Sequence, residues 1–182
     1  MVVEKKNRRV ARVHMTRKRR YLQESLRAAV CSEDALGIRV LTASGARGDV
    51  LSSDGHSPLH EACLRGSEEI ALTLLDAGVD VNVASEEGCT PLHAACRGGF
   101  ESLAEKLIAR GADVNARTKD EYVPLHFACR QGHTMLAVML MHHGADANAV
   151  SAYGETPEAL AGSRRHTSTA TTVCAIRMFG AR

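Results

Sequence analysis

Three pairs of histidine and cysteine are the residues of this sequence whose types and spacing could do chemistry. They are His60 and Cys63, His93 and Cys96, and His126 and Cys129. Residues three apart share one face of a helix, as in a Cys–His nucleophile or part of a zinc site. Three identical dyads in one chain are, however, far less expected than one structural position copied three times. The cysteines also lack close C-x-x-C spacing, and no Gly-rich phosphate loop or Gly-x-Ser-x-Gly turn is present. We therefore predict no catalytic residue, no metal, no cofactor and no enzyme activity.

The copying extends beyond these pairs and has a period of 33 residues. Proline recurs at positions 58, 91, 124 and 157, and an Asp-x-Asn motif recurs at 80–82, 113–115 and 146–148. A fixed period of this length indicates one supersecondary unit stacked on copies of itself. Such an array presents an extended surface instead of a natural pocket, which favours binding of another macromolecule over catalysis.

Each unit has the pattern of two short helices. Ser57 can cap a helix whose first residue is Pro58, and Gly66 can end it. A second helix follows and ends at Gly78. Its apolar stripe occurs three times at the 33-residue offset: Ile70, Ala71, Leu74 and Leu75; Leu103, Ala104, Leu107 and Ile108; Leu136, Ala137, Leu140 and Met141. Two short helices cannot bury such a stripe alone, so neighbouring units must cover it.

The segment Gly88-Cys-Thr-Pro-Leu-His-Ala-Ala-Cys96, followed by Gly111-Ala-Asp-Val-Asn-Ala116, closely resembles the ankyrin repeat family. The resemblance covers roughly residues 54–182. It implies an all-α solenoid of stacked helix-turn-helix units that binds through its turn tips and its concave helix face, with no particular chemistry. It also implies that the repeated histidine is a buried polar residue hydrogen-bonded to the turn backbone.

The period divides the chain into an arm, a faded copy and four repeats. We predict a basic disordered arm at 1–20, a degenerate capping repeat at 21–53, and repeats at 54–86, 87–119, 120–152 and 153–182. The faded copy rests on Leu26, Ala29, Leu41 and Gly45, which match the later repeats in phase. A simple helical lead-in is the alternative. The last repeat is weaker, because Thr169 replaces a core leucine, and we expect a leucine there to stabilise a fraying end.

One internal turn departs from the pattern. Glu121 stands where the other turns have glycine, and Val123 stands where they have a capping Ser or Thr. Loss of such a cap costs about 1 kcal/mol. The turn is therefore strained or reshaped for a ligand, unless it reflects drift at a tolerant position.

Charge is divided unevenly along the chain. The first 20 residues hold nine of the 23 Lys and Arg and one of the 21 Asp and Glu, so they carry +8 while the remainder carries −6. Two basic clusters in this arm resemble a two-part nuclear import signal: Lys5, Lys6, Arg8 and Arg9, and then Arg17, Lys18, Arg19 and Arg20. We expect contact with an import receptor. Nucleic acid, anionic lipid, a solvated tail and a mitochondrial presequence are the alternatives.

The sequence indicates a cytoplasmic or nuclear protein. It contains no apolar run long enough for a membrane span and no apolar stretch of a secretory signal. Cys63, Cys96 and Cys129 should lie one helix spacing apart, about 8–10 Å, which exceeds the reach of a disulfide. They fit small buried side chains in a reducing compartment.

Positions that vary while the framework repeats are the candidates for recognition. Those we predict to contact a partner are Arg65, Glu86, Glu87, Arg97, Asp120, Tyr122, Arg130 and Tyr153. Gln131 and Arg164 are further variable positions on the expected groove side of the first helices. Tyr and Arg are the residue types that anchor interfaces. We expect a protein-binding module that is an adaptor or an occupancy-type inhibitor. The alternative is a nuclear transcription or chromatin cofactor whose arm contacts nucleic acid. We expect no effector segment after the last repeat and therefore action by occupancy, with a piece of a larger scaffold as the alternative.

Overall fold

The computed structural model describes residues 17–179 apart from 19 and 53, and these residues form helices and loops without a strand. Residues 20–31 are helical and are followed by α2 (Ala35–Ala43). The remaining helices are α3 (Pro58–Arg65), α4 (Glu68–Asp76), α5 (Pro91–Gly98), α6 (Glu101–Ala109), α7 (Pro124–Gln131), α8 (Thr134–His142), α9 (Pro157–Ser163) and α10 (Thr167–Phe179). The four repeated prolines each open the first helix of a pair, as predicted.

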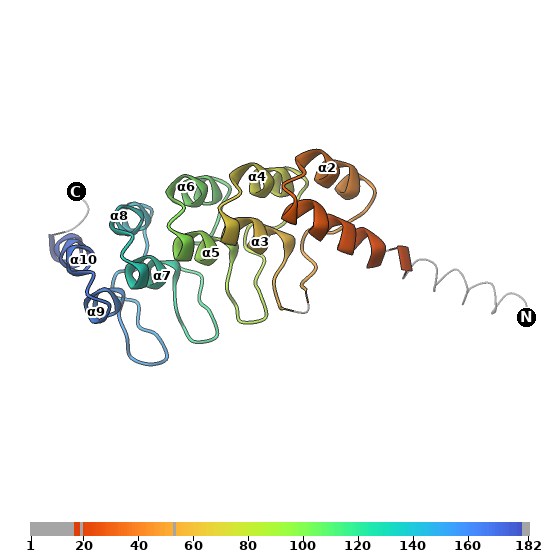
Figure 1. Ribbon diagram of the computed structural model, residues 1–182. Helices are drawn as coiled ribbons and strands as arrows, with labels where there is room; N and C mark the ends of the chain where they lie inside the picture. The colour runs from red at the N-terminus through yellow and green to blue at the C-terminus, as the bar shows by residue number, and fades with distance from the viewer. Residues whose placement is uncertain (1–16, 19, 53, 180–182) are drawn as a thin grey trace, which may run out of the picture.

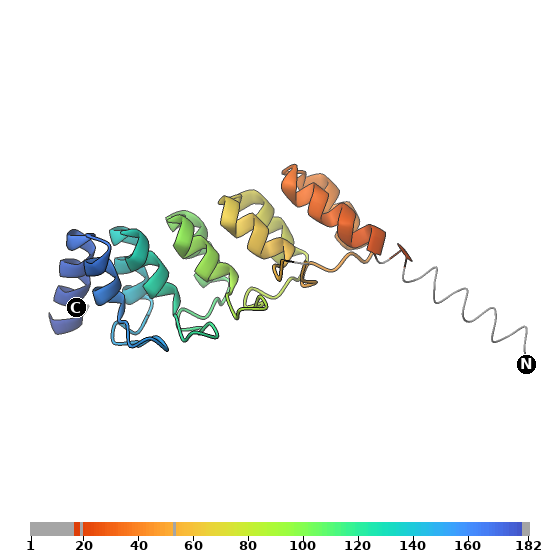
Figure 2. The same ribbon diagram turned by 60° about the horizontal axis from the view of Figure 1, so that its bottom comes forward.

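The helices lie in two rows along an elongated stack (Figures 1 and 2). The inner row contains α3, α5, α7 and α9, each in contact with the next, and every inner helix packs against the helix that follows it. Long loops leave the inner row on one side of the stack. The predicted all-α solenoid of stacked helix-turn-helix units is confirmed.

Local sequence explains where the inner helices begin and end. The Ser57 hydroxyl accepts a hydrogen bond from the backbone N–H of His60, which caps α3 as expected. Gly66 ends that helix with a φ of 70°, a left-handed conformation that favours glycine. Gly132 ends α7 in the same way, and a Cβ atom there would lie only 2.5 Å from the ring of His166. Glycine at these positions therefore allows the left-handed backbone and leaves room for a ring from the next repeat.

The core is a continuous layer between the two rows. Leu59, Leu92 and Leu125 of the inner helices are fully buried. All of the predicted stripe residues are buried except Ile108, which is partly buried and packs against the core. Burial of each leucine contributes about 1.5–3 kcal/mol, and every such contact is shared between neighbouring repeats.

A buried histidine in each of three repeats joins that repeat to the loop of the next. The Nε2 atom of His60 lies 2.7 Å from the Cys89 carbonyl oxygen, that of His93 lies 3.1 Å from the Tyr122 carbonyl, and that of His126 lies 3.1 Å from the Glu155 carbonyl. Each Nδ1 atom accepts a hydrogen bond from the backbone N–H three residues earlier. A carbonyl can only accept and a backbone N–H can only donate, so these imidazoles are neutral with the proton on Nε2.

A second set of inter-repeat bonds comes from the Asp-x-Asn motif. The Asn82 amide donates to the Gly111 carbonyl at 3.0 Å, and its oxygen accepts from the Asp113 N–H at 2.8 Å. Asn115 makes the same two bonds to Gly144 and Asp146, at 2.9 and 2.8 Å. The motif that marks the period in the sequence therefore serves to align successive repeats.

The segment predicted to be a degenerate repeat, 21–53, contains most of the first helix and all of α2. Leu26 and Ala29 are buried, Gly45 has a φ of 97°, and α2 packs against α4 as one helix of the outer row against the next. Helical backbone begins before the expected boundary, because residues 17, 18 and 20 are already helical and exposed. The basic residues Lys5, Lys6, Arg8, Arg9 and Arg19 lie outside the described residues.

At the other end, the structure changes the interpretation of Thr169. Its side chain is buried, as its position predicts, but its hydroxyl lies 2.7 Å from the hydroxyl of Thr134 in α8. A leucine at this position would remove that hydrogen bond and leave Thr134 with a long contact of 3.5 Å to the Gly132 carbonyl. The hydroxyl of the buried Thr169 is therefore already paired, and the loss of this hydrogen bond opposes the stabilisation expected from leucine.

The neutral imidazoles predict a loss of stability in weak acid. Burial lowers the pKa of His60, His93 and His126, and that of His93 falls to about 4. A group with a lowered folded-state pKa stabilises the fold above its unfolded pKa, about 6.5, and loses that contribution as the pH falls towards the folded value. For His93 alone the free energy of unfolding should drop by roughly 2 kcal/mol between pH 7 and pH 5.

Urea unfolding midpoints at pH 7 and pH 5 measure this drop. His142→Gln, at an exposed position, should show the same drop as the parent. His93→Gln should be less stable at pH 7 but should lose less on acidification. Equal midpoints for the parent at the two pH values would contradict the neutral-imidazole account.

Candidate protein-binding face

Three loops between helix pairs, at 84–90, 117–123 and 150–156, form what we call the finger loops. Each closes on itself through a backbone bond across its base, from Ser85 to Cys89, Thr118 to Tyr122 and Ser151 to Glu155, at 2.8–3.0 Å. Adjacent fingers are also joined, because the Lys119 N–H donates to the Glu87 carbonyl and the Ala152 N–H to the Asp120 carbonyl. The fingers are therefore a hydrogen-bonded array with fixed spacing and not independent loops.

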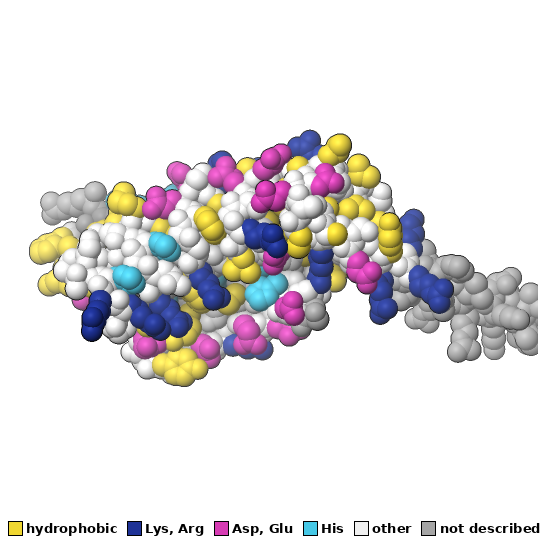
Figure 3. All heavy atoms as spheres, viewed as in Figure 1, with side chains coloured by type: hydrophobic (Ala, Val, Ile, Leu, Met, Phe, Trp, Pro, Cys, Tyr) yellow, Lys and Arg dark blue, Asp and Glu magenta, His cyan; other side chains and the backbone are white. Residues whose placement is uncertain are grey.

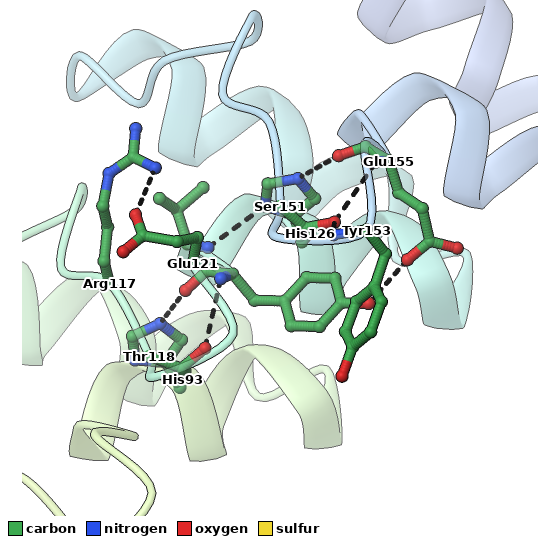
Figure 4. Close-up of polar contacts among 10 residues, drawn as sticks. His93, Arg117, Thr118, Glu121, His126, Ser151, Tyr153 and Glu155 are labelled. Carbon is green, nitrogen blue, oxygen red and sulfur yellow. Dashed lines mark hydrogen bonds and ion pairs between the residues drawn. The ribbon is translucent and has the colours of Figure 1, made fainter.

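The two predicted tyrosines come together between the second and third fingers. Their ring centroids are 6.2 Å apart (Figure 4). The Tyr122 hydroxyl donates to a Glu155 carboxylate oxygen at 2.5 Å, which raises the pKa of Tyr122, and the Tyr153 hydroxyl lies 3.3 Å from a carboxylate oxygen of Asp120. Tyr153 remains 67 % exposed. Both carboxylates therefore already accept a hydrogen bond from a tyrosine. The ring of Tyr153 nevertheless stays exposed and available for contact.

The finger at 117–123, where Glu121 and Val123 depart from the repeat pattern, also differs in its backbone. Glu121 has a φ of 62°, in the left-handed region, and its carboxylate pairs with Arg117 at 2.8 Å (Figure 4). The Val123 N–H still donates to His126 at 3.1 Å, so the imidazole maintains the turn although valine has no hydroxyl to act as a cap. The turn keeps the geometry of its neighbours at the cost of strain at Glu121.

Arginines form the other half of the candidate site. Arg97, Arg130 and Arg164 line one hollow of about 390 Å³ together with Phe127, Gln131 and His166. All three arginines are exposed, and no carboxylate of the described residues pairs with them. Figure 3 shows basic side chains gathered over α7 and α9, with acidic side chains along the loops beside them. We call this hollow the arginine groove.

Not every predicted residue belongs to this groove. Arg65 is held by Glu61 at 2.7 Å and lies against Cys31 of the preceding helix, so it is not part of the unpaired set. Glu86 and Glu87 are exposed on the first of the three fingers, and Glu87 has a loose ion pair with Lys119 at 3.8 Å. The groove is thus formed by residues of α5 and α7 and by the residues just after α9, and the acidic fingers lie beside it.

Two residues of the groove were not predicted as partner contacts. Phe127 stacks edge-on against His93 and Tyr122, at centroid distances of 5.3 and 6.1 Å, and it shares a shallow depression with Tyr122, His126, Arg130 and Leu160. His166 covers Gly132 and reaches the same hollow as the arginines. Phe127 occupies a position held by Glu61 and Ala94 in earlier repeats, so its variation was the signal available in the sequence.

The His–Cys pairs have the properties of core residues. Burial raises the pKa of the Cys63 and Cys129 thiols to about 12, so both remain protonated at neutral pH and are poor nucleophiles. Both nitrogens of each paired histidine are used in the bonds to backbone described above. Across residues 17–179, leaving out 19 and 53, no three His, Cys, Asp or Glu side chains gather as a metal site, and no helix is long and apolar enough to cross a membrane.

Comparison with known proteins supports the repeat architecture. Residues 26–118 match the family model described as ankyrin repeats in three copies, and residues 107–161 match the model described as ankyrin repeats in many copies. The first match begins inside the helix at 20–31 and includes α2. A comparison with curated proteins found no match.

Backbone strain at Glu121 predicts that glycine stabilises this turn. A left-handed conformation costs a non-glycine residue about 1–2 kcal/mol, whereas an exposed ion pair contributes about 0.2–1 kcal/mol. Glu121→Gly should therefore raise the free energy of unfolding by roughly 1 kcal/mol, as measured by urea denaturation. The matched control is Gly154→Ala, which places a Cβ where no atom lies within 4 Å and should lower stability by a similar amount. A loss of stability in Glu121→Gly would show that the ion pair outweighs the strain.

Proposed function

The chain belongs to the ankyrin repeat family, and we propose that it is a non-catalytic protein-binding module that acts as an adaptor or by occupying the surface of its partner. Ankyrin repeats generally mediate protein–protein interaction. The proposed contact surface is the arginine groove together with the finger loops, including Glu86, Glu87, Asp120, Tyr122 and Tyr153. Arg65 adds to it only if a partner displaces Glu61.

The observation that carries this proposal is the contrast between the framework and the arginine groove. Framework polar groups such as His93 and Asn115 are bonded to the next repeat, whereas Arg97, Arg130 and Arg164 share a hollow without a carboxylate. Arginine and tyrosine beside an aromatic surface are typical of the residues that dominate binding energy. An acidic surface of another protein supplies the missing charge.

A second function is favoured by the division of charge. Residues 1–20 carry +8 and the remainder −6, so we also consider a nuclear transcription or chromatin cofactor whose arm contacts nucleic acid while the repeats recruit a protein. An import receptor is the other candidate partner of the arm. This function would be supported if the chain bound nucleic acid with an affinity that falls steeply with salt, and if removal of residues 1–20 abolished that binding.

The two parts of the chain should be separable in one comparison. The full chain, a chain lacking residues 1–20, and the double variant Arg97→Glu/Arg130→Glu are compared for capture of partner proteins and for nuclear accumulation. Removal of the arm should leave capture within a few-fold and abolish nuclear accumulation. The double variant should do the reverse, since like charges then face the acidic partner while no internal ion pair is broken.

The control for charge reversal is Arg39→Glu, on α2 and away from the groove. It should capture partners as the parent does, and circular dichroism should show that every variant is folded. Loss of capture on removal of the arm, or normal capture by the folded groove variant, would assign recognition to another surface.

A further inference from the structure

The helices that carry the arginine groove are poor in carboxylates. In α3, the carboxylate of Glu61 holds the arginine at the end of the same helix at 2.7 Å. The equivalent positions in the next two repeats are Ala94 in α5 and Phe127 in α7. Neither α5 nor α7 contains an aspartate or glutamate, and the one carboxylate of α9, Glu158, is paired with Arg177 at 2.7 Å. These helices therefore supply no unpaired carboxylate to the guanidinium groups of the groove.

The hollow of the groove is lined by groups that donate hydrogen bonds. Its lining residues are Arg97, Phe127, Arg130, Gln131, Arg164 and His166. Each guanidinium presents five N–H donors and no acceptor, and the Gln131 amide and the His166 imidazole can each donate as well. Its volume of about 390 Å³ lies in the range of small-ligand pockets, about 300–1,000 Å³. The hollow therefore has room for one compact group and the donors to hold an anion.

A phosphate monoester matches this set of donors better than a carboxylate does. It carries a charge of about −1.5 to −2 at pH 7 and three strong acceptor oxygens. A carboxylate carries a single charge, and one bidentate guanidinium engages both of its oxygens. Clusters of arginine are a recurring means by which proteins recognise phosphorylated motifs. Three guanidinium groups in one hollow therefore favour a phosphorylated side chain over a single acidic residue.

The acidic fingers beside the groove restrict what can carry the phosphate. Glu86, Glu87 and Asp120 are exposed on the fingers, and Figure 3 shows acidic side chains along the loops beside the basic ones. A long polyanion such as nucleic acid would place further phosphates against these carboxylates, and like charges that face each other cost affinity. A peptide can place lysine or arginine there instead. The fingers therefore favour one phosphate flanked by basic residues.

Resting on the protein-binding function proposed above, we propose that the arginine groove binds a phosphorylated side chain of the partner, within a segment that also carries basic residues. The phosphate oxygens accept hydrogen bonds from Arg97, Arg130 and Arg164, and the basic residues face the acidic fingers. No ion pair among the described residues has to break for this contact. Phosphorylation of the partner therefore strengthens its binding to the groove.

The test measures binding of labelled peptides to the full chain by fluorescence anisotropy at physiological ionic strength. The first peptide, Lys-Ala-Ala-phosphoSer-Ala-Ala-Lys, is compared with matched peptides that have serine or glutamate at the central position. The phosphopeptide should bind about tenfold more tightly than either. A fourth peptide, with phosphoserine at the centre and glutamate in place of both lysines, should bind about fivefold more weakly than the first, because its ends face the acidic fingers.

Variants of the chain locate the binding site. Arg97→Gln and Arg130→Gln should each weaken binding of the phosphopeptide about tenfold, whereas the matched control Arg39→Gln, on α2, should change its affinity less than about twofold. All three arginines are exposed, so circular dichroism should show that each variant is folded. Every variant keeps the basic arm, so any attraction of the arm to phosphate is the same in each.

The remaining outcomes overturn the proposal. Equal affinity for the phosphoserine and glutamate peptides would show attraction to net charge, and unchanged affinity in Arg130→Gln would place the phosphate elsewhere. Tighter binding of a short single-stranded DNA, lost in the same variant, would assign the groove to nucleic acid. If no peptide binds while Arg97→Glu/Arg130→Glu still abolishes protein capture, the phosphate inference falls and the proposed function stands.

Discussion

A buried, neutral imidazole holds each of the three finger loops to the repeat before it. His60, His93 and His126 accept from their own helix start and donate to a carbonyl of the next finger. The bond crosses the boundary between repeats, so it fixes finger spacing as well as helix position. The same imidazole explains why the turn at Glu121 survives without glycine and without a capping hydroxyl. Burial makes this arrangement stable only while the ring is neutral, because a second proton on Nδ1 would face a backbone N–H.

The surface available for recognition is defined by which polar groups of the framework already have hydrogen-bond partners within the stack. The imidazoles and the Asn82 and Asn115 side chains form hydrogen bonds to the backbone of the next repeat. Part of the acidic charge on the fingers is likewise engaged, since Tyr122 and Tyr153 bond to carboxylates of the adjacent fingers. The arginine groove lacks such internal partners. Three arginines that share one hollow without a carboxylate are suited to meet an acidic surface of another chain.

The sequence predicted the framework well because a framework position is copied with the period. Pro58, Ser57 and the apolar stripes could each be assigned from one repeat and checked in two others. The groove was harder, because its residues vary by definition and the period says nothing about their partners. Thus Arg65 was predicted beside Arg97, yet an internal carboxylate holds it, and Phe127 was overlooked at a position where earlier repeats have Glu61 and Ala94. Thr169 was read as a missing leucine because its hydrogen bond to Thr134 depends on a contact between two helices, which no pattern within one repeat reveals.

Long-range ¹H–¹⁵N correlation NMR of the imidazole rings tests the role of these histidines most directly. At neutral pH, His60, His93 and His126 should each show a protonated Nε2 and an unprotonated Nδ1. Imidazolium signals or protonated Nδ1 atoms at these three positions would mean that the rings do not join the repeats as described.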